Sequence, residues 1–394
     1  MIKTITIYSL NIPFRFSYGH SKKQHRAVST IIVTAEDANG NVGIGEAVPR
    51  EYVTGETPES VFHEVTKLAS HFIGTAFSSK TEIDDKILNL AHSYHEIFPS
   101  CAFCCLDIAL HDLLSQKQKV SMARYLGCEP KPIKYTASIG LKNKPKLIAL
   151  LLLYRSLGFT SLKLKVGDAH DEDRLKVIHS VMGKNIRIHA DANGAWSLEQ
   201  AKSSIDLLSK YNVWAVEEPL TIPMGNEAAS RQHNREIVLS TNHFENYAKL
   251  RNSAALPIIL DESCISARSI SNAIQSNAFD YINMRLSKLG GYSITKNIID
   301  KILHDKKYGF GAMVGETAIL SSASYFLGCA HPDNLFVQGF SHKLLHKKNI
   351  ATENIELKRA FVQLSDSDKY GLGVHLNRAA ITDFLQKKHI VNYD

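Results

Sequence analysis

The 394-residue sequence contains no apolar run of the roughly 18 residues that a transmembrane helix needs. The longest candidate, Leu147–Leu153, is far shorter and is soon interrupted by charge. The first residues, MIKTITIYSLNIPFRF, also lack the basic start, apolar block and small-residue cleavage site of a secretory signal peptide. We therefore expect neither a membrane segment nor a membrane partner.

Cysteine is scarce, with six residues in the whole chain. Their positions show neither the paired spacing of a zinc ribbon nor the density of a disulfide scaffold. Cys104 and Cys105 lie in an apolar stretch, where thiols act as small hydrophobic groups. This pattern argues against a disulfide-stabilised secreted domain, and we predict the cytoplasm as the compartment.

A large excess of charge of one sign is also missing, because 46 basic and 39 acidic residues leave a formal charge of +7. The basic residues are scattered except for the run His342–Lys348, which is typical of a solvated loop. We expect no nucleic-acid partner, since that would need a concentrated basic surface. A small anionic molecule fits this charge equally well.

The first 130 residues have an α+β pattern. Alternating segments at Ile2–Ile12 and Val28–Thr34, followed by GNVGIGEAV, predict an antiparallel meander. Apolar residues at helical spacing predict helices over 60–73 and 100–115. The polar tail, about 356–394, is not another unit of the pattern that follows, and we expect it to return to this first domain.

From about residue 131 to 355, short apolar strands alternate with helix-length stretches. Parallel strands need crossover helices, and about 200–250 residues accommodate eight such units. The predicted fold class is therefore α/β, with a (β/α)₈ TIM-type barrel behind an amino-terminal α+β domain. The eight expected strands are KYTASIGL, SLKLKVG, IRIHADANG, VWAVEEPL, PIILDES, YINMRLSKLGG, FGAMVGET and NLFVQGF.

Ionisable side chains gather at the carboxyl ends of five predicted strands, the edge at which barrel enzymes place their active sites. We expect them to converge in one mouth. Lys163 and Lys165 lie two residues apart, so both side chains point to the same side of their strand. The residues in chain order are Lys163, Lys165, Asp191, Asn193, Glu217, Asp261, Glu262 and Lys288.

Three of these residues, Asp191, Glu217 and Asp261, are carboxylates on neighbouring strands. They should repel one another unless a cation lies among them, although Asp191 alone is equally typical of a helix N-cap. An all-oxygen donor set favours Mg²⁺ over Zn²⁺. Such a site suits proton abstraction from the carbon next to a carboxylate, with metal stabilisation of an enediolate and a lysine of depressed pKa as base.

Five motifs in this order resemble the enolase superfamily, in its muconate-lactonizing subgroup of cycloisomerases and dipeptide epimerases. They are KLK at 163–165, DAN at 191–193, EEP at 217–219, DES at 261–263 and K-x-G-G at 288–291. GIGEAVP and CCLDIALHDLL resemble the sheet and helix of that family's capping domain. The resemblance implies that Asp191, Glu217 and Asp261 bind Mg²⁺, that Lys165 and Lys288 form the acid/base pair, and that Lys163 is the auxiliary lysine.

The chain departs from the family pattern at three places. Between Glu217 and Asp261 it spends 44 residues where neighbouring units take 26 or 27, which indicates an insertion in TIPMGNEAASRQHNREIVLSTNHFENY. The region that corresponds to the family's Asp-x-Asp pair of the eighth strand reads GFSHKLLHKK, and Glu316 follows the seventh strand later than expected. The predicted substrate-binding residues are Phe16, Tyr18, Arg50, Tyr52, Asn193, Glu262, Glu316, Ser341 and His342.

The sequence thus predicts a Mg²⁺-dependent isomerase that acts on a small-molecule carboxylate. A racemase or epimerase of a dipeptide or N-acyl amino acid is the first choice, because two lysines supply a base for each face of the substrate. A muconate-type cycloisomerase, an o-succinylbenzoate-synthase-like dehydratase and a catalytically silent barrel are the alternatives. Gly290 and Gly291 indicate either a simple turn or a close approach of substrate. We further predict a homo-oligomer.

Overall fold

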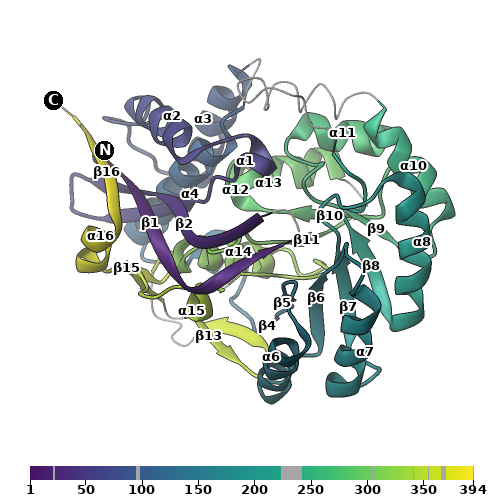
Figure 1. Ribbon diagram of the computed structural model, residues 1–394. Helices are drawn as coiled ribbons and strands as arrows, with labels where there is room; N and C mark the ends of the chain where they lie inside the picture. The colour runs from purple at the N-terminus through teal and green to yellow at the C-terminus, as the bar shows by residue number, and fades with distance from the viewer. Residues whose placement is uncertain are drawn as a thin grey trace.

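The computed structural model describes residues 1–20, 23–94, 98–222, 242–303, 306–339, 341–353, 355–364 and 370–393. Two regions share this part of the chain, a sheet with packed helices and a curled parallel sheet (Figure 1). No helix in the described ranges is long and apolar enough to cross a membrane. Much of the predicted insertion, residues 223–241, lies outside the described residues.

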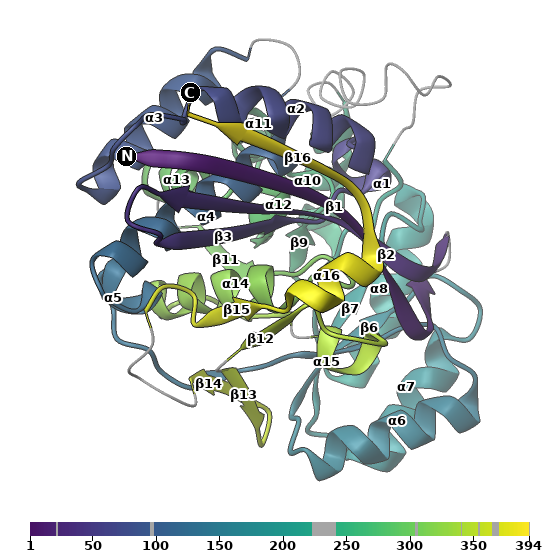
Figure 2. The same cartoon turned by 90° about the vertical axis from the view of Figure 1, so that its left-hand side faces the viewer.

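The first region, here called the cap, is a four-stranded antiparallel sheet with helices on one face (Figures 1 and 2). Its strand order is β16-β1-β2-β3, so the last strand of the chain pairs with the first and the two termini lie close together. The strands of the cap are β1 (Ile2–His20), β2 (Lys23–Asp37), β3 (Val42–Ala47) and β16 (Leu385–Asn392). Its helices are α1 (Glu51–Thr54), α2 (Pro58–Ser70), α3 (Lys80–His92), α4 (Ser100–Lys117) and α5 (Met122–Tyr125).

Local sequence explains how these elements form and pack. Helix α2 begins at a capping box, in which the side chains of Thr57 and Ser60 each form a hydrogen bond with the other residue's backbone N–H. Pro58 occupies the first helical position. Helix α4 lies directly on β3, and a Cβ atom at Gly45 would collide with the backbone of Cys105. Glycine in GNVGIGEAV therefore permits a close helix–sheet approach that a larger residue would prevent.

The second region is a parallel sheet in the order β11-β10-β9-β8-β7-β6-β5, with crossover helices on its outer side (Figure 1). Its strands are β5 (Ala137–Ile139), β6 (Ser161–Lys165), β7 (Arg187–Asp191), β8 (Val213–Glu217), β9 (Ile258–Leu260), β10 (Tyr281–Met284) and β11 (Lys307–Phe310). The helices between or after them are α6 (Lys144–Ser156), α7 (Asp171–Met182), α8 (Leu198–Leu208), α10 (His243–Ser253), α11 (Ala267–Gln275), α12 (Leu286–Leu289), α13 (Tyr292–Ile298), α14 (Ala318–Ala330) and α15 (His342–Leu345).

The two edges of this sheet meet at Val337. Isolated parallel bridges join Val337 to Phe310 at the end of β11 and to Tyr135 just before β5. The predicted eighth strand is therefore present over the described residues as a pair of bridges instead of a full strand. The TIM-type barrel with an amino-terminal cap, predicted from the sequence, is confirmed by this arrangement and by the fold comparisons given below.

Two details of the barrel differ from the prediction. The seventh strand covers Lys307–Phe310, so AMVGET is a loop and Glu316 lies six residues beyond the strand end. Lys288 does not lie on the sixth strand, which ends at Met284, but on the short helix α12. In both cases a continuous apolar run was assigned to one strand, although the chain turns over the barrel mouth after four residues.

The tail of the chain contacts both regions. Its strand β16 pairs with β1 in the cap, whereas β13 (Ile355–Lys358) and β14 (Phe361–Leu364) form a small sheet with β4 (Ile133–Lys134). Strands β12 (Ala351–Glu353) and β15 (Val374–Leu376) pair with each other. The division at about residues 130 and 355 stays a prediction.

Candidate active site

Adjacent parallel strands bring three of the predicted site residues into one row. Lys165, Asp191 and Glu217 are register partners across β6, β7 and β8. Asp261 follows β9 directly, on the next strand of the sheet. Asp191, Glu217 and Asp261 are fully buried, so the row lies inside the barrel mouth.

Two lysines of β6 contact this row from the same side. The Lys163 Nζ lies 2.7 Å from Asp191 Oδ2 and 2.8 Å from Glu217 Oε1, so it bridges the two carboxylates. The Lys165 Nζ donates to Asp191 Oδ2 at 2.6 Å and to Asn193 Oδ1 at 2.5 Å. Both side chains thus point to one side of the strand, as their spacing predicts.

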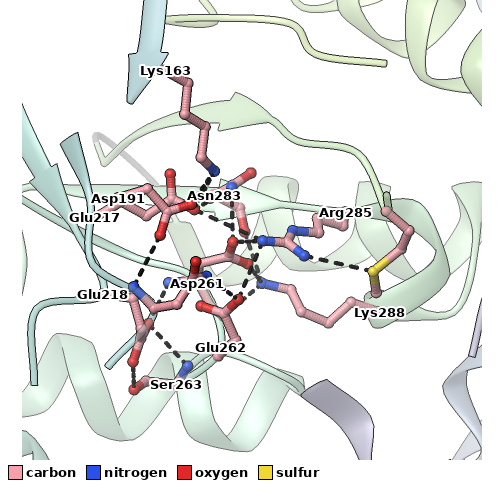
Figure 3. Close-up of polar contacts among 12 residues, drawn as sticks. Lys163, Asp191, Glu217, Glu218, Asp261, Glu262, Ser263, Asn283, Arg285 and Lys288 are labelled. Atoms are coloured by element: carbon pink, nitrogen blue, oxygen red, sulfur yellow. Dashed lines mark hydrogen bonds and ion pairs between the residues drawn. The ribbon is translucent and has the colours of Figure 1, made fainter. Parts of the chain in front are cut away.

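A second set of cations meets the row at Asp261; in Figure 3 Arg285 and Lys288 come from the right, whereas Lys163 comes from above. The Lys288 Nζ donates to Asp261 Oδ1 at 2.9 Å, to the Asp261 carbonyl at 2.7 Å and to the Asn283 carbonyl at 2.8 Å. Arg285 donates to Asp261 Oδ2 and, at 3.4 Å, to Glu262 Oε1. The carboxylates are thus contacted by the two lysines of β6 and by Arg285 and Lys288 of the sixth barrel unit.

These contacts correct one premise of the sequence argument. The carboxylates were expected to need a metal cation among them, but the ammonium and guanidinium groups of Lys163, Arg285 and Lys288 lie there. The cation needed to relieve repulsion is supplied by side chains in this arrangement. Arg285 was not among the predicted site residues, and neither was Asn283, which donates to Glu217 Oε1 at 2.9 Å and to Asp261 Oδ2 at 3.0 Å.

The surroundings shift the pKa values of the site in different directions. Burial lowers the pKa of Lys165 despite the attraction of Asp191, and Lys163 lowers it further. Burial, together with the charge of Arg285, lowers the pKa of Lys288 to about 7. Burial also opposes the charged form of Lys163, but the carboxylates of Asp191 and Glu217 raise its pKa overall. Burial and the nearby Asp191 raise the pKa of Glu262 to about 7.

Glu218 has a different position from its neighbour Glu217. Its carboxylate accepts hydrogen bonds from the backbone N–H of Asp261 at 2.8 Å and of Ser263 at 3.1 Å, and from the Tyr247 hydroxyl at 3.0 Å. A wholly buried carboxylate thus fixes the turn that presents Asp261. Glu218 is a supporting residue, and it was not among the predicted site residues.

Two predicted cap residues lie beside the charged row. Arg50 is 7% exposed, and its Nη2 donates to the Val314 carbonyl at 2.6 Å. The sulfur of the preceding residue, Met313, lies 3.5 Å from Nη1 of Arg285, so the two guanidinium groups flank the same short loop. The charges of Arg50, Arg285 and Glu262 all influence the pKa of Tyr52, which burial raises. Arg50 and Tyr52 therefore reach the barrel mouth.

Asn193 and Glu262 also belong to the row, because Asn193 Nδ2 donates to Glu262 Oε1 at 3.1 Å. Glu316 is buried and accepts hydrogen bonds from the Met313 N–H at 3.0 Å and the Ser321 hydroxyl at 2.9 Å. Burial raises the pKa of Glu316, and the positive charge of Arg285, which contacts the row, partly offsets this.

Of the other predicted substrate-binding residues, Phe16, Ser341 and His342 are not brought into the row. Phe16 is 49% exposed on β1 and lies under Lys142. Ser341 precedes α15. His342 is buried, and its ring centroid lies 6.1 Å from that of His346. The side chain of Tyr18 lies outside the described residues. The roles of all four stay predictions.

The donor set fits a hard divalent cation by its chemistry. Asp191, Glu217 and Asp261 offer buried carboxylate oxygens, the ligands that Mg²⁺ prefers. In the described residues, however, no three acidic, histidine or cysteine side chains are arranged to hold a metal directly. The ammonium and guanidinium groups named above contact those oxygens, and a bound cation would compete with them.

The fold and the site define a barrel enzyme with an α+β cap and an acid-and-lysine centre at the carboxyl ends of its strands. The family described as "Enolase C-terminal domain-like" matches residues 147–239 and 235–380 of the chain. The protein belongs to this family, the enolase superfamily, and to its muconate-lactonizing subgroup.

Individual relatives agree with this assignment. The chain is 29% identical to the D-Ala-D/L-Ala epimerase of Cytophaga hutchinsonii over 293 residues, which cover 74% of this chain and 72% of the relative. It is 25% identical to the N-succinyl-L-Arg/Lys racemase of Bacillus cereus over 398 residues, 99% of each chain. The crystal structure of the dipeptide epimerase from Cytophaga hutchinsonii, complexed with Mg and D-Ala-L-Val, superimposes with a TM-score of 0.83 at 23% identity and full coverage of both chains.

Proposed function

We propose that the protein is a racemase or epimerase that removes the proton α to the carboxylate of a dipeptide or N-acyl amino acid. The observation that carries this proposal is that Lys165 and Lys288 contact the same row of buried carboxylates from different units of the barrel, Lys165 at Asp191 and Lys288 at Asp261. Inversion at carbon needs a base on one face of the substrate and an acid on the other. The relatives named as dipeptide epimerases and N-succinyl amino acid racemases support the same reaction class.

The lysines have separate tasks in this reaction. A lysine must be neutral to accept a proton from carbon, and burial favours the neutral forms of Lys165 and Lys288. The other lysine, in its ammonium form, returns a proton to the opposite face. Lys163 remains charged between Asp191 and Glu217 and disfavours a proton on its neighbour Lys165.

We propose Mg²⁺ as the cofactor, held by Asp191, Glu217 and Asp261. When bound, it would supply positive charge that stabilises the negative charge developing on the substrate carboxylate. Structures of the dipeptide epimerases of Cytophaga hutchinsonii and Enterococcus faecalis contain Mg, which supports this choice.

The surroundings of Arg50 favour a substrate with a second anionic group. Among the described residues no acidic side chain forms an ion pair with Arg50, although its side chain is almost fully buried. Its Nε atom also lacks a hydrogen-bond partner there. A buried cation is costly unless it is paired, so a carboxylate at the far end of the substrate would stabilise it. The eighth strand, which lacks the family's Asp-x-Asp pair, gives no opposing reason to prefer a free ammonium group.

The test is exchange of the α proton in D₂O, followed by mass spectrometry with dipeptides and N-acyl amino acids of both configurations. In a two-base enzyme, Lys165→Ala should abolish exchange from one stereoisomer and retain some from the other, and Lys288→Ala should do the reverse. Each selective loss should be about 10²–10⁴-fold, the usual contribution of a positioned general base.

A different outcome would favour another reaction. If Lys288→Ala retained exchange from every stereoisomer and lost only turnover, Lys288 would stabilise charge without moving a proton. A cycloisomerase or dehydratase would then replace the epimerase, in line with 23% identity to the o-succinylbenzoate synthase of Bacillus subtilis over 393 residues. The cytoplasmic compartment and the homo-oligomer stay proposals, the latter open to test by light scattering.

A further inference from the structure

The segment that carries Lys288 is bonded to the cap immediately before that residue. Ser287 Oγ accepts a hydrogen bond from the Val48 N–H, the residue after β3, at 3.0 Å. The Cys101 thiol of α4 donates to the Ser287 carbonyl at 3.3 Å. The backbone at Lys288 therefore takes its position partly from cap residues and not only from the barrel.

A second bond to the cap lies just after Lys288, at the start of α13. Asp107 of α4 is fully buried, and its carboxylate accepts hydrogen bonds from the Tyr292 N–H, from the Ser293 N–H at 3.3 Å and from the Ser293 hydroxyl at 2.5 Å. A carboxylate here satisfies backbone donors that the first turn of a helix leaves free.

Gly291 makes this approach possible. Its φ is +94°, and a Cβ atom built there would lie 2.8 Å from the Cβ atom of Asp107. Gly291 of the K-x-G-G motif thus admits the Asp107 side chain. This accounts for its need to be glycine without any contact to substrate.

One helical turn further along α4, His111 completes the connection. Its Nε2 atom lies 3.0 Å from the Ser293 hydroxyl and 3.3 Å from Asp107 Oδ1. Its Nδ1 atom lies 2.8 Å from the Tyr125 hydroxyl. The imidazole is therefore held between the cap and the first turn of α13.

Lys288 has little freedom to compensate if its backbone moves. The side chain is fully buried, and Nζ donates to three acceptors on Asp261 and Asn283. A displacement of α12 would therefore move the amine relative to the substrate carbon, and a shift of about 1 Å in a reacting group can cost on the order of 10²-fold in rate.

We propose that Asp107 is a positioning residue for Lys288: from the cap, it fixes the turn between α12 and α13 and thereby sets where the amine lies. The effect on catalysis rests on the proposed two-base function, because it assumes that Lys288 serves one stereoisomer. The structural part, fixation of the turn by Asp107, does not depend on any reaction.

Three variants test the proposal. Asp107→Asn weakens the carboxylate bonds, and Ser293→Ala is a milder change that removes only the hydroxyl partner and serves if the first variant does not fold. Asp112→Asn is the matched control on the same helix. Asp112 is equally buried and accepts hydrogen bonds from Ile44 at 2.9 Å and Leu372 at 2.7 Å, outside the Lys288 segment.

The first measurement is amide hydrogen exchange of the full-length protein, read by mass spectrometry over residues 286–298. Asp107→Asn and Ser293→Ala should each accelerate exchange in that segment about ten-fold relative to the control variant, because they loosen the turn locally. Equal protection of the segment in all three variants would overturn the proposal, whatever the enzyme catalyses.

The second measurement is α-proton exchange in D₂O from each stereoisomer, with Lys288→Ala identifying the isomer that depends on Lys288. Asp107→Asn should slow exchange from that isomer at least about ten-fold more than from the other. A general loss of stability would slow both equally, as we expect of Asp112→Asn. The positioning role would be refuted if Lys288→Ala slowed exchange from one stereoisomer selectively while Asp107→Asn and Ser293→Ala slowed exchange from both stereoisomers equally. Loss of selectivity in Lys288→Ala itself would instead refute the two-base function and leave the first measurement to decide whether Asp107 fixes the turn.

Discussion

Replacement of Lys163 by methionine should show how strongly the buried carboxylates depend on side-chain cations. The variant keeps most of the side-chain volume and removes an amine that is 2.7 Å from Asp191 and 2.8 Å from Glu217. Both carboxylates are fully buried and Lys163 itself is only 4% exposed, so water cannot replace the lost charge. Removal of one partner from a buried ion pair typically costs about 3–5 kcal/mol.

We expect the lower end of this range, about 3 kcal/mol of unfolding free energy, because other donors remain. Lys165 still contacts Asp191 at 2.6 Å, and Asn283 still donates to Glu217 at 2.9 Å. Urea unfolding of the metal-free protein measures the loss. Lys176→Met is the control, because its pair with Glu172 is 57% and 44% exposed and solvent screening should make its contribution small.

The same variant tests the proposed metal site without any assay of activity. Mg²⁺ should stabilise Lys163→Met more than the unmodified protein, because the cation would relieve a repulsion that Lys163 otherwise neutralises. The reasoning would be refuted if Lys163→Met unfolded at the same urea concentration as Lys176→Met. Equal stabilisation of both proteins by Mg²⁺ would separate Lys163 from the metal site.

Two further predictions concern the cap. The carboxylates of Asp107 and Asp84 raise the pKa of the buried His111 to about 9, although burial opposes its charged form. Because the pKa of His111 is higher in the folded than in the unfolded protein, its charge should stabilise the fold fully below about pH 6.5, and this stabilisation should be lost by about pH 9. The loss should amount to roughly 3 kcal/mol of unfolding free energy. His111→Gln should flatten this pH dependence in urea titrations between those two pH values. Arg50→Gln should raise KM about ten-fold or more for substrates with a distal carboxylate and leave neutral ones nearly unchanged, whereas equal effects on both classes would contradict anion binding by Arg50.

Alternation along the strands was the strongest signal in the sequence. Because side chains two residues apart share a face, KLK placed Lys163 and Lys165 together, and their common contact with Asp191 agrees with that. The same rule applied to YINMRL would have put Asn283 and Arg285 on one face, and both contact Asp261. The signal for these two residues was present, but neither belonged to a recognised motif.

Other features depend on contacts that no local pattern contains. Asp107 and Tyr292 are 185 positions apart, so the reason for glycine at 291 exists only in the folded chain. The barrel closes at Val337 through single bridges although NLFVQGF has the pattern of a full strand, so the short pairing is seen only in the folded chain. The loop after β11 also kept an apolar character, because Met313 is buried against the barrel mouth, and this made the loop resemble a strand.

The charges at the centre nearly balance without a metal. Asp191, Glu217 and Asp261 lie among the cationic groups of Lys163, Lys165, Arg285 and Lys288. A divalent cation added to this set would leave an excess of positive charge, which disfavours the protonated forms of the lysines and favours an anionic substrate. Both effects are those that proton abstraction next to a carboxylate requires. Two of the counter-charges that hold the buried carboxylates in the described arrangement, Lys165 and Lys288, are thus the same groups that we propose to move the substrate's proton.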